Sequence, residues 1–307
     1  MGRFLLKIFL FILPIWIVLL GVDYSYSYRI AQANASFSKP FYDVYLSADS
    51  NYDVLVCGNS RASLQYDPNI IDSILDCNSY NLGFDGSPIN LQLVKYDYWL
   101  KEHAHPNLCI YNIDLWTMKA EYGKNREQLF PYFVIDRSLM RAFDEYQNYT
   151  FTEKYIPFRR YIGHRKLISG VLKGNLSFSK GYYGHDWSWQ FLNRRDNQDL
   201  YKCAYDSAMI VTFGDFIARE QEHGVKFLFV YAPMFHTITM NNPDIPKMYA
   251  MYSDIASQFD IPILDYNYDL LCQDSAYFFN KMHLNKAGAE IFTTKLAHDI
   301  DSLGLLK

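Results

Sequence analysis

A short apolar run that ends in Gly-Asn-Ser constrains the fold of this chain more than any other part of its sequence. Residues 53–57 read Asp-Val-Leu-Val-Cys, a pattern typical of a strand buried on both faces of a parallel sheet. The turn Gly58-Asn59-Ser60 would then leave Ser60 at the carboxyl edge of the sheet, where open α/β folds bind ligands. Ser60 is therefore a candidate nucleophile; the alternative is a serine that only caps the next helix.

A histidine near the other end of the chain is a candidate partner for Ser60. His283 stands in a predicted loop just before an amphipathic helix over residues 286–302. A neutral imidazole can accept the proton of a hydroxyl group during attack on an acyl carbon. We predict that the two side chains meet above one edge of the sheet.

The spacing of the apolar runs predicts an α/β fold, a three-layer sandwich around a five-stranded parallel sheet of the flavodoxin type. After the strand at 53–57, further strands are expected at 79–82, 108–113, 225–231 and 261–264, and helices at 87–103, 200–223, 246–258 and 286–302.

Residues from about 117 to 197 interrupt this alternation, because no sheet-like pattern recurs there at the expected spacing. We interpret them as a helical insertion after strand three that covers the serine. The aromatic-rich stretch at 181–189 would either face a glycan or pack inside the insertion.

The N-terminus carries a candidate membrane helix. Residues 8–22 are an unbroken apolar run, and residues 4–6 lengthen it to about nineteen positions if Lys7 reaches the interface. A cleaved signal peptide is the alternative, but the small-x-small sequence at 31–33 lies well beyond the apolar run, which favours an uncleaved anchor. Arg3 and Lys7 would keep the N-terminus in the cytoplasm and export the rest of the chain.

These features predict three segments: an anchor over residues 1–23, a stem or linker over 24–52, and a catalytic domain over 53–307 with its insertion. We expect a single-pass protein of the inner (cytoplasmic) membrane, with the catalytic domain in the periplasm or at the cell exterior and the bilayer contacted through residues 4–22.

Composition excludes some classes of function. The formal net charge is -4, from 29 basic and 33 acidic residues, so no basic balance points to a nucleic-acid partner. The five cysteines form no even framework and show no Cys-x-x-Cys spacing. We expect no metal site, no cofactor and no disulfide network.

Three short blocks, in this order and spacing, resemble the SGNH (GDSL-like) hydrolase superfamily. They are Gly58-Asn59-Ser60, the stretch Asn81-Leu82-Gly83-Phe84-Asp85-Gly86, and residues 280–289 around His283. The sequence Ser60-Arg61-Ala62, the ending His283-Leu284-Asn285 and the N-terminal apolar run look most similar to the membrane-anchored envelope branch. That branch includes the D-alanine transfer protein of lipoteichoic acid and the alginate O-acetylation proteins.

The resemblance implies roles for individual residues. Ser60 would be the nucleophile, His283 the base, and the backbone amides of Ser60 and Gly86 the oxyanion hole. The third block of the family supplies an asparagine donor, and no Gly-x-Asn-Asp is present here, since Asn112 falls inside the strand. Further substrate-side candidates at the predicted carboxyl edge are Arg61, Asp114 and His236.

One departure from the family pattern concerns the base. Where the family has an aspartate three residues before the histidine, this chain has Asn280, whose amide carries no charge and can present either its oxygen or its NH₂ group to the imidazole. The ring could be oriented by Asn280 or a main-chain carbonyl in a Ser-His dyad, or the site could be a binding relic. A nearby carboxylate could also supply the charge, from Asp265, Asp269 or Asp274.

Two functions follow from these patterns. The first is a membrane-anchored, serine-dependent esterase or O-acyltransferase that acts on an envelope polysaccharide, with a membrane-bound O-acyltransferase as the source of acyl groups. The second is a catalytically impaired accessory protein of the same fold, which binds glycan or a membrane-bound O-acyltransferase.

Overall fold

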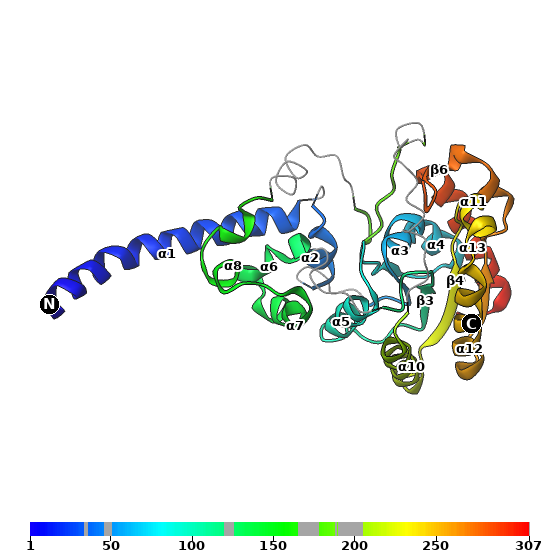
Figure 1. Ribbon diagram of the computed structural model, residues 1–307, viewed down its shortest axis with the longest axis horizontal. Coiled ribbons are helices and arrows are strands. Elements are labelled where there is room, and N and C mark those ends of the chain that lie inside the picture. Colours follow the sequence, from blue (N-terminus) through cyan, green and yellow to red (C-terminus); the bar gives the residue numbers. More distant parts are fainter. Residues whose placement is uncertain are drawn as a thin grey trace. The chain divides into compact units, whose positions relative to one another are not determined.

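The computed structural model describes residues 1–33, 36–45, 51–119, 126–164, 178–187, 189 and 205–306 (Figure 1). The chain divides into two compact units. One unit joins Met1–Leu46 to Asn125–Ser177, and the other joins Ser47–Lys124 to Phe178–Lys307.

The second unit is built on a five-stranded parallel sheet in the order β2-β1-β3-β4-β5, which confirms the predicted α/β fold. Its strands are β1 (Val54–Cys57), β2 (Ser79–Asn81), β3 (Leu108–Asn112), β4 (Lys226–Tyr231) and β5 (Ile263–Asp265).

Helices cover both faces of this sheet, as the buried apolar strands require. The helices are α3 (Ser60–Gln65), α4 (Pro68–Leu75), α5 (Ile89–Trp99), α10 (Ser207–Glu222), α11 (His236–Asn241), α12 (Ile245–Phe259) and α13 (Lys286–Leu303).

The two faces of each strand meet different helices. Val56 and Ile110 belong to the core that α3, α4 and α13 share through residues such as Phe292. On the other face, Tyr111 contacts Phe213 of α10 with ring centroids 4.8 Å apart. This alternation gives the three layers.

Before α13 the chain forms a small antiparallel hairpin of β6 (Phe278–Asn280) and β7 (His283–Leu284). The hairpin follows two short 3₁₀ turns, Leu270–Gln273 and Ser275–Tyr277. His283 is the first residue of β7 and lies just before the last helix, whereas the sequence predicted a loop at this position.

The first unit consists of helices. They are α1 (Gly2–Gln32), α2 (Lys39–Tyr45), α6 (Tyr132–Ile135), α7 (Arg137–Gln147) and α8 (Phe151–Tyr155), with 3₁₀ turns at Arg126–Leu129 and Arg159–Tyr161. A core of aromatic and aliphatic side chains, including Ile30 and Phe130, joins the end of α1 to the inserted helices.

A buried ion pair adds to this packing. Arg160 Nη2 lies 2.6 Å from Asp23 Oδ1 and 2.9 Å from Ser27 Oγ, and both charged side chains are buried. Asp23 therefore ties α1 to the insertion at the point where the apolar run ends.

The N-terminal part of α1 differs from the rest of the helix. Most of its large apolar residues between Phe4 and Val22 are exposed, and α1 is long and apolar enough to cross a membrane. Figure 1 shows this part as a free length of helix beyond the other elements of its unit.

The structure adds detail to the predicted stem and insertion. Residues 24–32 continue α1, and α2 occupies 39–45, with Pro40 in its first turn, where a proline costs no helical hydrogen bond. Residues 126–164 group with these N-terminal helices, whereas 178–187 belong to the unit that holds Ser60. The expectation that the insertion covers the serine stays a prediction. The boundaries at 23/24 and 52/53 stay predictions, and the insertion's expected end at 197 lies outside the described residues.

Candidate active site

The turn that carries Ser60 is fixed by its neighbours. Gly58 has φ +140°, and a Cβ at this position would lie 2.9 Å from the Cβ of Ala62, so only glycine fits. The Asn59 side chain accepts a hydrogen bond from the Arg61 amide at 3.0 Å and caps α3. Ser60 thus begins α3 at the carboxyl edge of the sheet, as the sequence predicts.

The structure brings Ser60 and His283 together. Ser60 Oγ lies 2.9 Å from His283 Nε2, although 223 positions separate the two residues in the chain. This is the separation required for direct transfer of the hydroxyl proton to the imidazole.

Asn280 determines which ring nitrogen carries the proton. Its Oδ1 lies 2.8 Å from the Met282 amide nitrogen and 3.0 Å from that of His283. Because backbone N–H groups can only donate, the side-chain atom at this position must be the carbonyl oxygen. The same oxygen lies 3.0 Å from His283 Nδ1, so Nδ1 carries the proton and Nε2 is free to accept from Ser60.

The three aspartates considered as alternative partners of the ring have other contacts. Asp265 accepts from the Tyr249 hydroxyl at 2.7 Å, Asp269 pairs with Lys295, and Asp274 caps the 3₁₀ turn at Ser275–Tyr277. The structure therefore favours Asn280 as the group that orients the imidazole.

The His283 ring is held in its neutral form. Burial is the main cause that lowers its pKa from 6.5 to about 3, and coulombic interactions with Arg61 and His185 act in the same direction. The neutral ring is ready to accept a proton, while the imidazolium that would form has no carboxylate beside it among the described residues. Deprotonation of Ser60 is therefore less favoured than it would be beside an aspartate.

Arg61 and Asp114, predicted as substrate-side residues, are both 1% exposed. Arg61 donates through Nη2 to the Ala232 carbonyl, and Asp114 Oδ2 accepts from Asn59 Nδ2 at 2.5 Å. Asp114 Oδ1 also accepts from the Trp116 amide at 2.9 Å. These contacts hold the turn around Ser60 from within the protein, so the two side chains position the site rather than face a substrate.

His236, the third substrate-side candidate, lies at the start of α11. Its Nδ1 is 3.2 Å from the Cys272 carbonyl oxygen, and its ring centroid lies 4.4 Å from that of Phe235. A role for His236 at the site stays a prediction.

The loop after β2 lies beside the Ser60 turn. The Phe84 amide donates to the Gly58 carbonyl at 2.9 Å, and Gly86 adopts φ +62°. Burial raises the pKa of the Asp85 carboxyl, while a hydrogen bond from the Gly86 backbone lowers it in part. The role of the Gly86 amide as an oxyanion donor stays a prediction.

Lys95 supports this loop and was not foreseen from the sequence. It is buried in α5, and its Nζ donates to the Gly83 carbonyl at 3.1 Å. Burial lowers the pKa of Lys95 to about 7. A lysine at a predicted helix position is ordinarily placed in solvent, so only the packed structure shows this contact.

Asn112 lies inside β3, as expected, and is fully buried. Its Oδ1 accepts a hydrogen bond from the Tyr66 hydroxyl at 2.9 Å. Asn112 therefore does not replace the exposed asparagine donor that the family places at the end of this strand.

Aromatic residues surround the base, and the sequence indicated them only in part. The Phe279 ring stacks on His283 with centroids 5.3 Å apart, and His185 lies 4.6 Å from Phe279 and 4.5 Å from Trp187. Trp187 is 58% exposed, so its ring faces solvent close to the base. Part of the aromatic stretch at 181–189 thus lies beside His283, although Ser188 is outside the described residues.

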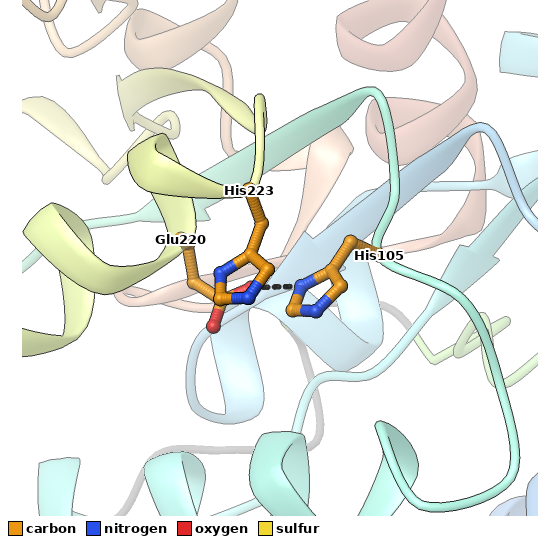
Figure 2. A group of neighbouring side chains, drawn as sticks. All are labelled: His105, Glu220 and His223. Carbon is orange, nitrogen blue, oxygen red and sulfur yellow. Dashed lines mark hydrogen bonds and ion pairs between the residues drawn. The ribbon is translucent and has the colours of Figure 1, made fainter.

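A group of possible metal ligands lies away from this site. His105, Glu220 and His223 place their ligand atoms within 4.8 Å of one another (Figure 2). His105 precedes β3, and the other two stand at the end of α10 before β4, so the group lies at the amino edge of the sheet. The sequence predicted no metal site, and it gave no Cys/His spacing that would indicate this one.

Comparison with known proteins gives likenesses to solved structures at low sequence identity. No family model matches the chain, and no curated protein matches it. The fold is similar to that of a solved structure described as a platelet activating factor from Streptococcus pneumonia, at 11% identity, a TM-score of 0.43, and coverage of 91% of this chain and 94% of that one.

Two further solved structures are similar to the same extent. An acetyl xylan esterase is 11% identical with a TM-score of 0.41, over 81% of this chain and 98% of its own. A protein from Bacteroides fragilis described as an acylhydrolase is 11% identical with a TM-score of 0.44, over 88% and 96%. At these identities and TM-scores, nothing about the reaction rests on the likeness.

Proposed function

We propose that this chain is a serine-dependent acyl-transfer enzyme of the SGNH type, either an esterase or an O-acyltransferase. The observation that carries the proposal is the relay in which Asn280 Oδ1 faces His283 Nδ1 and His283 Nε2 faces Ser60 Oγ, at 3.0 and 2.9 Å. The order of the three sequence blocks around Ser60, Gly86 and His283 supports the same family.

The proposed reaction has two half-steps. Ser60 Oγ attacks the carbonyl carbon of an ester while its proton passes to His283 Nε2, and backbone amides at the turn stabilise the oxyanion. When the intermediate collapses, the leaving alcohol takes the proton from His283 and the acyl group stays on Ser60. Water or a sugar hydroxyl then attacks the acyl-serine, gives its proton to His283, and Ser60 recovers its proton as it leaves.

The proposed setting is the cell envelope. An anchor within α1 would hold the enzyme at the inner membrane, and Arg3 and Lys7 before the apolar run favour a cytoplasmic N-terminus. The substrate would be an envelope polysaccharide or its acyl ester, with a membrane-bound O-acyltransferase as the source of acyl groups. This part of the proposal rests on the resemblance of the sequence blocks to the envelope branch.

A second candidate is an accessory protein that binds glycan or a membrane-bound O-acyltransferase without turnover. Asn280 brings no charge to the imidazole, and Asn112 lies buried inside β3 rather than at the place where the family has an asparagine donor. Both features would slow acyl transfer.

Hydrolysis of p-nitrophenyl acetate by the full chain in detergent micelles separates the two candidates. An enzyme should release p-nitrophenol with a rate that depends on His283, and a sugar acceptor should become acetylated if transfer occurs. A rate equal to that of the His283→Ala variant would support the accessory role.

The pH dependence of the reaction should report the unusual state of the base. Because the pKa of His283 is lowered to about 3, the ring binds a proton only in strong acid, and the base stays active as the pH falls below 6.5. We expect kcat/KM to be level between about pH 5 and about pH 8 and to fall only towards about pH 3. An acid limb near 6.5 would contradict this assignment.

Replacing Asn280 by aspartate should raise the pH at which kcat/KM falls in acid. A carboxylate oxygen can accept the same three N–H groups as the amide oxygen, and its charge stabilises the imidazolium. We expect a higher pKa for His283 and a kcat/KM at neutral pH raised by about tenfold or more. Unchanged values in both measurements would mean that another group already stabilises the imidazolium.

A further inference from the structure

We propose that His105, Glu220 and His223 bind a divalent transition metal ion, of which Zn²⁺ is the probe we would use. The site lies at the amino edge of the sheet and does not depend on the proposed reaction. Two imidazole nitrogens and one carboxylate oxygen suit zinc and its neighbours, whereas magnesium and calcium prefer oxygen ligands alone.

Helical spacing places two of the ligands together. Glu220 and His223 are three residues apart at the end of α10, so both project from one face of the chain. Such a Glu-x-x-His pair is a recurring source of metal ligands on helices. The third ligand comes from the loop before β3, where His105 Nδ1 lies 2.7 Å from Glu220 Oε2.

The two imidazole rings lie parallel. Their centroids are 4.1 Å apart with an interplanar angle of 10°, and Figure 2 shows them side by side next to the carboxylate. Because the lone pair of an imidazole nitrogen lies in the ring plane, the His223 ring must turn out of this stack before it and His105 can face a common ion.

Contacts behind the ligands fix the tautomer of His223 and the position of the Glu220 carboxylate. His223 Nδ1 lies 2.8 Å from the Arg219 carbonyl oxygen, so this nitrogen carries the ring proton and leaves Nε2 free for a metal. Glu220 is fully buried and accepts from the Tyr96 hydroxyl at 3.0 Å and from Arg219 Nε at 2.9 Å. Such second contacts orient metal ligands and fix the tautomer of histidines.

The local charge also favours a cation. The Arg219 guanidinium, which contacts Glu220, is paired through Nη2 with Asp97 at 2.6 Å. Two carboxylates against one guanidinium leave the group with a net negative charge. The proton between His105 and Glu220 would leave when the ion binds.

The three ligand atoms must move closer together before they can bind one ion. Ligand atoms around tetrahedral zinc lie about 3.3 Å apart, which follows from bond lengths of about 2.0–2.1 Å. The present atoms lie within 4.8 Å of one another, and His223 is exposed, so its ring has solvent on one side into which it can turn. Water would complete the coordination, and the ion would join the loop before β3 to the end of α10.

Zinc titration of the full chain tests this site. The protein in detergent micelles is freed of metal with a chelator and titrated with ZnCl₂ by calorimetry. We expect one zinc ion per chain that raises the melting temperature, and a loss of at least about tenfold in affinity in His223→Ala and in His105→Ala. The matched control is His298→Ala on the exposed side of α13, which should bind zinc as the wild type does.

Two results would overturn the proposal. One is wild-type zinc affinity in both His223→Ala and His105→Ala, which would place any bound zinc elsewhere, for example on a cysteine. The other is no binding by the wild type at all. His223 is exposed, so its replacement is not expected to unfold the chain, and the melting temperature without metal checks this point. Binding should also persist in Ser60→Ala, which separates this test from that of the proposed reaction.

Discussion

Replacing Ser60 by alanine is expected to lower kcat/KM for ester hydrolysis by about 10⁴-fold or more. The hydroxyl that would attack the ester lies 2.9 Å from His283 Nε2, and alanine leaves that nitrogen with no nucleophile to activate. His283→Ala should lose activity on the same scale, because the two residues act as a unit. The double variant should then be no worse than either single one.

The control for this prediction is another serine with a helical setting but no contact with the base. Ser73 of α4 is exposed and donates to the Ile70 carbonyl at 2.9 Å, so Ser73→Ala should retain wild-type kcat/KM. Retention of more than about one hundredth of the activity in Ser60→Ala would remove Ser60 from the role of nucleophile.

Replacing Asp23 by alanine is expected to destabilise the unit of α1 and the insertion by about 3–5 kcal/mol. Arg160 Nη2 lies 2.6 Å from Asp23 Oδ1 and would lose this partner. Its guanidinium would stay buried, because it also lies over the rings of Phe133 and Tyr161. Hydrogen exchange of backbone amides in residues 126–164 of the full chain measures the effect. Faster exchange across these helices is the expected result.

Two further variants make the Asp23 prediction specific. Glu145→Ala on the exposed side of α7 should leave exchange unchanged. Asp23→Leu combined with Arg160→Met should recover most of the loss, since apolar pairs often replace buried ion pairs without cost. Wild-type exchange in Asp23→Ala would show that the ion pair does not hold the unit together.

The layered fold and the meeting of Ser60 with His283 could be predicted because both depend on local patterns. Apolar runs such as residues 53–57 and 225–231 indicate buried parallel strands, and parallel strands bring their carboxyl ends to one edge. The turn at Gly58 and the helix after His283 then limit where the two side chains can lie.

Other features depend on contacts between residues far apart in the sequence, which no local sequence pattern indicates. The orientation of the Asn280 amide follows from the two backbone N–H groups that the hairpin of β6 and β7 presents to it. The grouping of 126–164 with α1 rests on an apolar core and on the ion pair of Arg160 with Asp23, two residues that are 137 positions apart. The burial of Arg61 and Lys95 likewise arises from tertiary packing, which overrides the usual preference of charged residues for solvent.

Covalent labelling of the full chain by a fluorophosphonate tests most directly whether Ser60 is a nucleophile activated by neutral His283. Between about pH 6 and about pH 9, we expect one adduct per wild-type chain, located by mass spectrometry on the peptide that contains Ser60. The adduct should be absent from Ser60→Ala and form much more slowly in His283→Ala. No adduct on the wild type, or an adduct that persists in Ser60→Ala, would contradict this assignment.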